Sequence, residues 1–365
     1  MHVSLVKRHR DHVESRLASI WERVLDVDVV MPQDNFFNLG GDSVKALIVC
    51  TRVKAEFGFR LSVNDMFEMP TVAQLATILR SGGQERPETN LVEIAAVDND
   101  AWPLYFVHAA PGEVMFLRWI RPHTLSRTVH GVRASGFQLS VQPAKTVEEM
   151  AERYVDAILA RSGTAPVMLA GYSAGGVIAY EMARRLAAAG VPVPYLGLVD
   201  PSVPDIEEAD PESLLPRLMK TRLAFLLDLY QLPNSWVGRT DAVSALRDAG
   251  AVPADYSADL FERTLEIWAR NVLATRCYRP DTPYQGPAVL YTSAVEVKGD
   301  SGQLGDFVAS GDPYASEWGA LLPTHTPVWL SAENHFEIMN DPQLFPRMRD
   351  DLDAAQAHCM AWVGR

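Results

Sequence analysis

Apolar residues recur at helical spacing along the first 80 residues of the chain. One stripe runs through positions 13–24, a second begins near Ser43 and ends at Gly58, and a third spans 71–79 after a short turn at 63–67. Side chains three and four positions apart share one face of a helix, so each stripe predicts a helix with a buried side. Counting the short turn as a helix, residues 1–82 are predicted to form a small four-helix bundle.

The pattern changes after a polar segment rich in glycine and proline, at residues 83–91, which is typical of a linker. Residues 92–365 then contain apolar runs of strand length that alternate with helical stretches. Such runs predict a parallel sheet covered by helices on both faces. From about 203 to 276 the alternation stops and the pattern is helical, which predicts a lid inserted into this α/β domain. The predicted strands are 104–107, 167–170, 195–199, 288–291 and 327–330.

Composition limits the classes of function. The chain has 365 residues, 48% of them hydrophobic, so two domains with proper cores are possible. A formal net charge of −13 argues against a nucleic-acid-binding surface. No apolar run is long enough to span a membrane, and the basic N-terminus lacks the apolar stretch of a signal peptide, so a cytoplasmic protein is expected. The three cysteines are widely spaced, which predicts neither a disulfide framework nor a metal site.

The segment 171–176, Gly-Tyr-Ser-Ala-Gly-Gly, lies between a predicted strand and a predicted helix. A serine at so sharp a strand-to-helix turn is held in a strained backbone conformation, and flanking glycines let neighbouring chains approach closely. Its hydroxyl is then exposed at the sheet edge beside a helix N-terminus. This context predicts Ser173 as a nucleophile in an α/β-hydrolase fold. The alternative is a serine that merely caps the helix.

The remaining members of a triad follow in the chain order of an α/β-hydrolase, serine, acid, histidine. Asp200 stands at the end of the strand after the nucleophile, although an Asp-Pro pair could also simply begin a turn. His335 lies in the loop between the last predicted strand and the last helix, where the base belongs. The other histidines lie before the nucleophile, before that strand or within the final helix.

The predicted oxyanion hole combines two backbone N–H groups. The residue after the nucleophile, Ala174, supplies one, and the loop after the first predicted strand supplies the other. Ala109 and Ala110 are both candidates there, and the sequence does not separate them. The preceding residue, His108, is expected to shape this loop rather than act as a second base.

A second candidate site is the run Asp-Asn-Phe-Phe-Asn-Leu-Gly-Gly-Asp-Ser at 34–43. On local chemistry alone, Asp42 or Ser43 could be an ordinary helix N-cap. The run resembles the DxFFxLGGDS motif of peptidyl carrier proteins of nonribosomal peptide synthetases. That resemblance implies that Ser43 carries a covalent 4′-phosphopantetheine arm, with a phosphopantetheinyl transferase and upstream condensation and adenylation domains as partners.

The C-terminal domain resembles the type I thioesterases that end such synthetases, in its nucleophile motif, the spacing of its acid and the His335-Phe336…Met339 cluster. Family members often have proline where this chain has Ala109, and glycine where it has Glu333. Neither departure removes a catalytic group. The implied architecture is a small four-helix carrier bundle followed by an α/β-hydrolase domain with a helical lid.

These resemblances imply a chain-terminating thioesterase that moves a peptidyl thioester from the arm on Ser43 to Ser173. Hydrolysis and macrocyclisation are both open as release chemistry, and the peptide is not identified. Two other functions stay possible: a carrier and docking module with an inert hydrolase-like domain, and a freestanding serine esterase. A reductive release domain is excluded because no Gly-x-Gly-x-x-Gly follows a strand.

Overall fold

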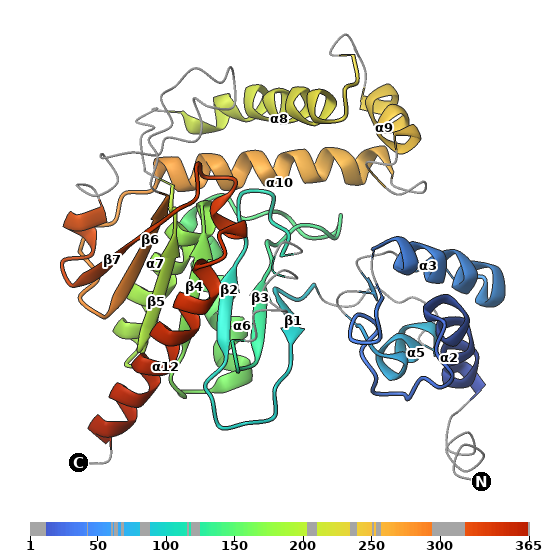
Figure 1. Cartoon of the computed structure of the whole chain (residues 1–365). Helices are drawn as coiled ribbons and strands as arrows, with labels where there is room; N and C mark the ends of the chain where they lie inside the picture. Colours follow the sequence, from blue (N-terminus) through green and yellow to red (C-terminus); the bar gives the residue numbers. More distant parts are fainter. Residues whose placement is uncertain are drawn as a thin grey trace. The chain divides into compact units, whose positions relative to one another are not determined.

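The computed structural model describes residues 12–41, 43–59, 61, 65–66, 69–80, 88–114, 117, 125–202, 210–233, 239–249, 252, 257–293 and 318–363. The chain divides into two compact units, Met1–Pro87 and Glu88–Arg365 (Figure 1). Glu88 already belongs to the second unit, because its carboxylate accepts the N–H groups of Gly136 (2.7 Å) and Gln138 (3.0 Å).

The first unit packs its described helices around one core. These are α2 (His12–Leu25), α3 (Ser43–Phe57) and α5 (Val72–Arg80). Trp21 of α2 lies edge-on against Phe36, with ring centroids 4.9 Å apart, and both side chains are fully buried. In α2 and α5 the predicted stripes form the buried faces. In α3, Val53 is buried as the second stripe predicts, but Ile48 of the same stripe is 41% exposed, so the buried face of α3 is only partly the predicted one. The expected fourth helix, near residues 63–67, lies mostly outside the described residues.

The second unit is built on a seven-stranded sheet with the order β1-β3-β2-β4-β5-β6-β7. Only the pairing of β1 with β3 is antiparallel. All five predicted strands are present, but β1 and β3 are additional. The strands are β1 (Leu91–Ala95), β2 (Leu104–Val107), β3 (Val129–Val132), β4 (Met168–Tyr172), β5 (Tyr195–Val199), β6 (Ala288–Ser293) and β7 (His325–Leu330).

The two extra strands correct the predicted set of strands, in which 104–107 was the first and 167–170 the next. β1 is half exposed at the sheet edge, and it opens at Leu91, which was expected in the linker. β3 is fully buried but reads Val-His-Gly-Val, and its Gly131 lies so close to Val114 that a Cβ would be 2.7 Å from the Val114 side chain. A histidine and a glycine interrupt the apolar run by which a buried strand is recognised.

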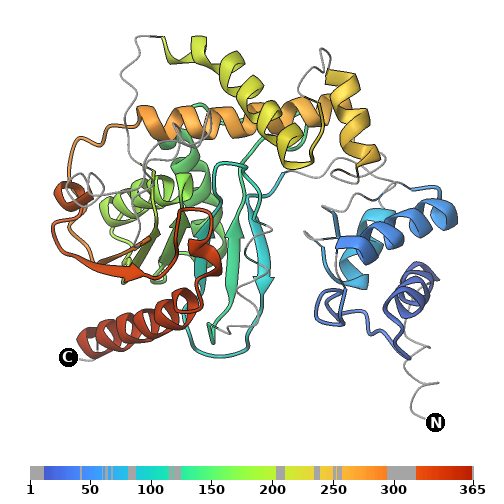
Figure 2. The ribbon, with the colours of Figure 1, turned by 45° about the horizontal axis from the view of Figure 1, so that its top comes forward.

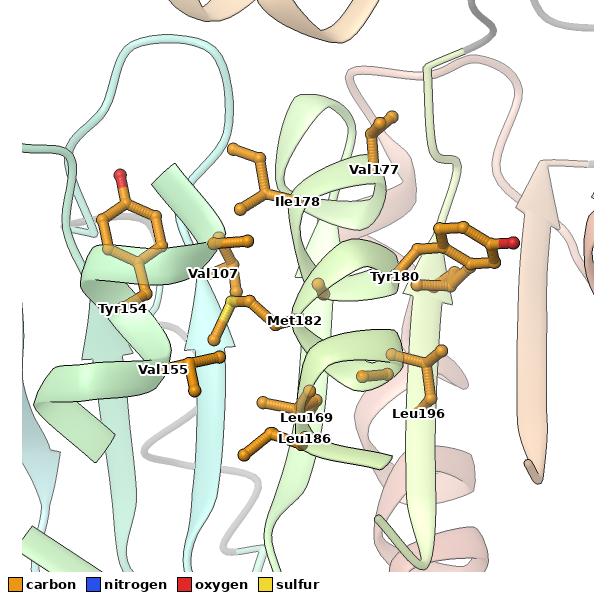
Figure 3. Packing of buried hydrophobic residues seen from close by; sticks show 14 of the residues in the cluster. Val107, Tyr154, Val155, Leu169, Val177, Ile178, Tyr180, Met182, Leu186 and Leu196 are labelled. Atoms are coloured by element: carbon orange, nitrogen blue, oxygen red, sulfur yellow. The ribbon is translucent and has the colours of Figure 1, made fainter. Parts of the chain in front are cut away.

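Helices cover both faces of the sheet. On one face, α6 (Val147–Ser162) and α7 (Ala174–Ala188) pack against alternate strand residues, among them Val107, Leu169 and Leu196 (Figure 3). On the other face, α12 (Leu344–Val363) packs against the intervening residues, such as Phe106 and Ala170. Side chains alternate along a strand, so strands covered on both faces are apolar throughout.

A helical segment lies between β5 and β6. It contains a 3₁₀ turn, η3 (Pro211–Leu214), followed by α8 (Leu215–Leu229), α9 (Arg239–Asp248) and α10 (Ala258–Cys277). Figures 1 and 2 show α10 running across one end of the sheet, with α8 alongside it. Phe261 and Leu265 near the start of α10 pack with α8 and α9, whereas Ala274 near its end joins the core against α6 and α7.

The strand order reverses between β2 and β4. The connection from β2 leads to β3 on one side, whereas β4 leads through α7 to β5 on the other. The loops after β2 and β4 therefore diverge at the carboxyl edge, where ligands bind in open parallel sheets. None of the described helices is both long and apolar enough to cross a membrane.

Candidate active site

Ser173 joins β4 directly to α7, and its backbone is strained. Its φ is 57° and its ψ is −125°, in a region that residues with a side chain rarely adopt. Its N–H donates to the Val199 carbonyl of β5 at 2.9 Å, which holds the turn in place. Among the described residues, its hydroxyl accepts no capping N–H from α7. The side chain is therefore not used as an ordinary helix cap.

Glycine is required on both sides of this turn. A Cβ on Gly171 would lie 2.1 Å from the Gly175 carbonyl oxygen, and one on Gly175 would lie 2.3 Å from the His108 carbonyl oxygen. Neither contact has room for a side chain. The second also shows that the start of α7, with Ala174, lies directly against the loop that follows β2.

Asp200 follows β5 and is fully buried, with φ 40°. Ser293, the last residue of β6, donates to both of its carboxylate oxygens, through its N–H at 3.1 Å and through its hydroxyl at 3.0 Å. The sequence did not identify Ser293, because the predicted apolar run ended at residue 291. A small polar residue closing the strand next to the acid is the signal that could have found it.

His335 lies beside this carboxylate, as the sequence predicted. Its Nδ1 is 3.3 Å from Asp200 Oδ2, and both side chains are buried. The contact is long, and among the described residues Nδ1 has no partner aligned as a hydrogen bond. The distance is nevertheless within ion-pair range, and such contacts commonly tighten only when substrate binds.

Tyr172, next to Ser173, supports His335 in two ways. Its ring stacks on the imidazole with centroids 4.9 Å apart, and its hydroxyl donates to the His335 carbonyl at 2.7 Å. Burial, with a smaller contribution from the nearby Asp200 charge, raises the Tyr172 pKa well above its usual range. The phenol therefore stays protonated and remains a donor. No pattern in the sequence identified Tyr172 as a residue that holds His335 in place.

The loop after β2 contains Ala109 and Ala110, and His108 shapes it from within. The His108 Nδ1–H donates to the Ala109 carbonyl at 2.8 Å, so Nε2 is the acceptor for the Tyr154 hydroxyl at 2.8 Å. Burial lowers the pKa of His108 to about 4. A neutral imidazole with both nitrogens occupied cannot serve as a second base, as expected.

In the first unit, the turn before Ser43 is set by two glycines. Gly40 has φ +89°, and a Cβ on Gly41 would lie 2.4 Å from the Phe36 ring. Phe36 in turn donates its N–H to the Pro70 carbonyl at 2.7 Å, which fixes the loop to the start of α5. Ser43 is the first residue of α3, whereas Asp42 lies outside the described residues.

Comparison with known families assigns both units. The thioesterase domain family matches residues 102–342, which include strands β2 to β7, Ser173, Asp200 and His335. The chain belongs to the thioesterase domain family. A phosphopantetheine attachment site domain matches residues 15–79, so this thioesterase follows an N-terminal carrier domain.

Relatives of this thioesterase are parts of large synthetases. It is 34% identical over 193 residues to malpibaldin synthetase of Mortierella alpina, covering 52% of this chain and 3% of that protein. It is 27% identical over 291 residues to a dimodular nonribosomal peptide synthase of Bacillus subtilis, covering 77% of this chain and 12% of that protein. The chain thus spans only a small part of these relatives.

A solved structure shares the fold. The crystal structure of a four-domain nonribosomal peptide synthetase, bound to AMP and glycine, aligns with 97% of this chain and 26% of its own. The TM-score is 0.55 and the sequence identity is 24%. At this identity the likeness shows a shared fold.

Proposed function

We propose that this chain ends the assembly of a nonribosomal peptide, by taking a peptidyl thioester from its carrier domain onto Ser173 and releasing it. The observation that carries the proposal is the strained backbone of Ser173, at φ 57°. Among the described residues, the Ser173 hydroxyl caps no helix. A backbone strain of roughly 1–3 kcal/mol persists where the surrounding structure enforces it, and such sites are commonly functional.

The neighbouring residues support a serine-histidine-aspartate mechanism. His335 accepts the Ser173 proton as Oγ attacks the thioester carbonyl carbon, and Asp200 stabilises the resulting imidazolium. The carbon–sulfur bond then breaks, and the same proton passes from His335 to the departing sulfur, leaving an acyl ester on Ser173. The two bonds from Ser293 keep the Asp200 carboxylate oriented toward Nδ1 throughout.

Ala174 and Ala110 are the proposed oxyanion donors. In a trans peptide the N–H points away from the preceding carbonyl. The Ala109 carbonyl accepts inward bonds from His108 Nδ1 and from the Gly112 N–H at 2.9 Å, so the Ala110 N–H faces the opposite way. The His108 carbonyl instead approaches Gly175 of α7, which turns the Ala109 N–H away from that helix. This geometry favours Ala110 over Ala109.

Ser43 is the proposed attachment point of 4′-phosphopantetheine. Its place fits, because the turn made by Gly40 and Gly41 against Phe36 leads directly into α3 at Ser43. The bound group would supply the thiol that holds the acyl chain as a thioester. A phosphopantetheinyl transferase that modifies Ser43, and upstream condensation and adenylation domains that build the peptide, are the proposed partners.

The helices between β5 and β6 are the proposed lid, within the expected range of about 203–276. The start of α10 packs with α8 and α9, and Arg263 there donates to the Gly136 and Val141 carbonyls of the loop after β3. A helical segment that runs across one end of the sheet can regulate how much water reaches the acyl ester. Water would release an acid, whereas exclusion of water would favour attack by an amine or hydroxyl of the peptide and ring closure.

Small thioesters test the chemistry separately from the carrier. We expect the native chain to hydrolyse S-acyl-pantetheine, and a fluorophosphonate to label it at Ser173, as read by peptide mass spectrometry. Ser173→Ala should lose both signals, with thioester turnover lowered by at least about 10³-fold. Absence of labelling in the native chain would favour an inert hydrolase-like domain. Labelling without modification of Ser43 by coenzyme A and a transferase would favour a freestanding esterase.

A further inference from the structure

Helix α10 contacts the loop after β2 at two successive points. The Asn271 side-chain amide donates to the Ala110 carbonyl at 3.0 Å. Two residues further along the loop, a Cβ on Gly112 would lie 2.7 Å from the Ile267 side chain, so the backbone passes directly over α10. Ala110 also packs against the apolar cluster that contains Trp268. The loop is therefore in contact with a helix that also belongs to the proposed lid.

These contacts determine the position of Ala110 from two sides. The carbonyl before its N–H, that of Ala109, is held from within the domain by His108 and Gly112. Its own carbonyl is held from α10 by Asn271. Because Pro111 follows, the peptide after Ala110 has no N–H that could hold it in another way. Orientation of the Ala110 N–H thus depends on two hydrogen bonds to the Ala109 carbonyl and one from α10 to the Ala110 carbonyl.

We propose that Asn271 is a positioning residue for the oxyanion hole, through which α10 sets the direction of the Ala110 N–H. The inference rests on the proposed function, since it concerns the donor that the hydrolytic mechanism uses. It adds that the oxyanion hole is complete only while α10 is seated against the loop, so movement of the lid changes the rate of acyl transfer as well as access to the cleft.

The surroundings of Asn271 agree with a specific polar role. It is 97% buried, in the stretch of α10 where Trp268, Val272 and Leu273 form an apolar cluster. Burying an amide there costs free energy unless it is hydrogen-bonded, and leucine of similar shape would pack without that cost. The bond to Ala110 is the compensating interaction.

The experiment replaces Asn271 with leucine, which keeps the branched shape and the number of side-chain heavy atoms and removes the donor. With S-acyl-pantetheine as substrate, we expect Asn271→Leu to lower kcat about tenfold, the effect of roughly 1.4 kcal/mol, and to change KM less than twofold. An alkylboronic acid, which forms a tetrahedral adduct on Ser173, should bind about tenfold more weakly, because its oxygen occupies the oxyanion position.

Thr264→Val is the matched control. It removes a hydroxyl from the same helix that donates only to the Phe261 carbonyl within α10, and it should leave kcat and boronate affinity unchanged. Equal kcat and boronate affinity in native and Asn271→Leu chains would overturn the inference, as would a rise in KM that accounts for the whole effect. Neither result affects the proposed function, which is tested separately by fluorophosphonate labelling, thioester hydrolysis and Ser43 modification of the native chain.

Discussion

Two residues of the candidate site share an unusual backbone conformation. Ser173 and Asp200 both have positive φ, 57° and 40°, at the ends of adjacent strands. Each is held by the strand beside it, since Ser173 donates its N–H to Val199 and Asp200 donates its N–H to Tyr291, both at 2.9 Å. Hydrogen bonds to neighbouring strands therefore hold the strained backbone at both positions.

His108 is predicted to make the protein sensitive to acid. Its pKa is about 4 in the folded chain, against about 6.5 when exposed, so the unfolded chain takes up the proton first as pH falls. The contribution of neutral His108 to the free energy of unfolding is therefore fully present above pH ~6.5. It is lost as the pH falls toward ~4, by about 3 kcal/mol. His108→Gln keeps a donor and an acceptor but cannot titrate.

Urea unfolding between pH 7 and 4.5 checks this expectation. The variant should lose less unfolding free energy on acidification than the native chain. Some acid sensitivity should remain in both, because burial also lowers the pKa of His130 to about 4. Identical pH slopes for the two chains would show that His108 is not the responsible group.

At the residue scale the sequence predicted Asp200 and His335 from chain order and strand position, and the structure places these two side chains together. It could not predict Ser293 or Tyr172. Their roles arise from the pairing of β6 with β5 and from the return of the chain after β7, which are contacts between residues far apart in sequence. Patterns among neighbouring residues of the sequence do not predict such contacts.

At the element scale, the sequence predicted those elements in which apolar residues recur with one clear spacing. Helix α7 was expected after the segment 171–176 and is observed at Ala174–Ala188, because its apolar face is long and uninterrupted. Strands β1 and β3 were missed because they are short and lack a continuous apolar run. Their placement depends on the strand they pair with, which only the assembled sheet determines.

Helix α6 offers a test of local stability that is separate from the site. Thr146 is its N-cap, and the hydroxyl accepts the Glu149 N–H at 3.2 Å. Thr146→Ala should lower the free energy of unfolding by about 1 kcal/mol, measured by urea denaturation, while thioester turnover stays unchanged. Thr146→Ser keeps the acceptor and should restore most of the loss. A fall in turnover with Thr146→Ala would indicate that α6 influences the site.

At the scale of the whole molecule, the proposed function divides one reaction between the two units. The carrier domain places Ser43 at the start of α3, and the thioesterase domain places Ser173 at the start of α7. The sequence predicted both serines, from one motif each, and the family matches agree with the domains that surround them. Neither serine alone can both hold and release a peptide.

In the proposed function, the acyl group on Ser43 leaves through Ser173. Intact-protein mass spectrometry tests this transfer by following the acyl mass on the loaded chain. A phosphopantetheinyl transferase would load acyl-pantetheine from acyl-coenzyme A onto the native chain, Ser173→Ala and Ser43→Ala. We expect the loaded native chain to lose its acyl mass with time, Ser173→Ala to stay loaded, and Ser43→Ala to gain no mass. Equal loss of the acyl group from the native chain and Ser173→Ala would show that the acyl group does not leave through Ser173.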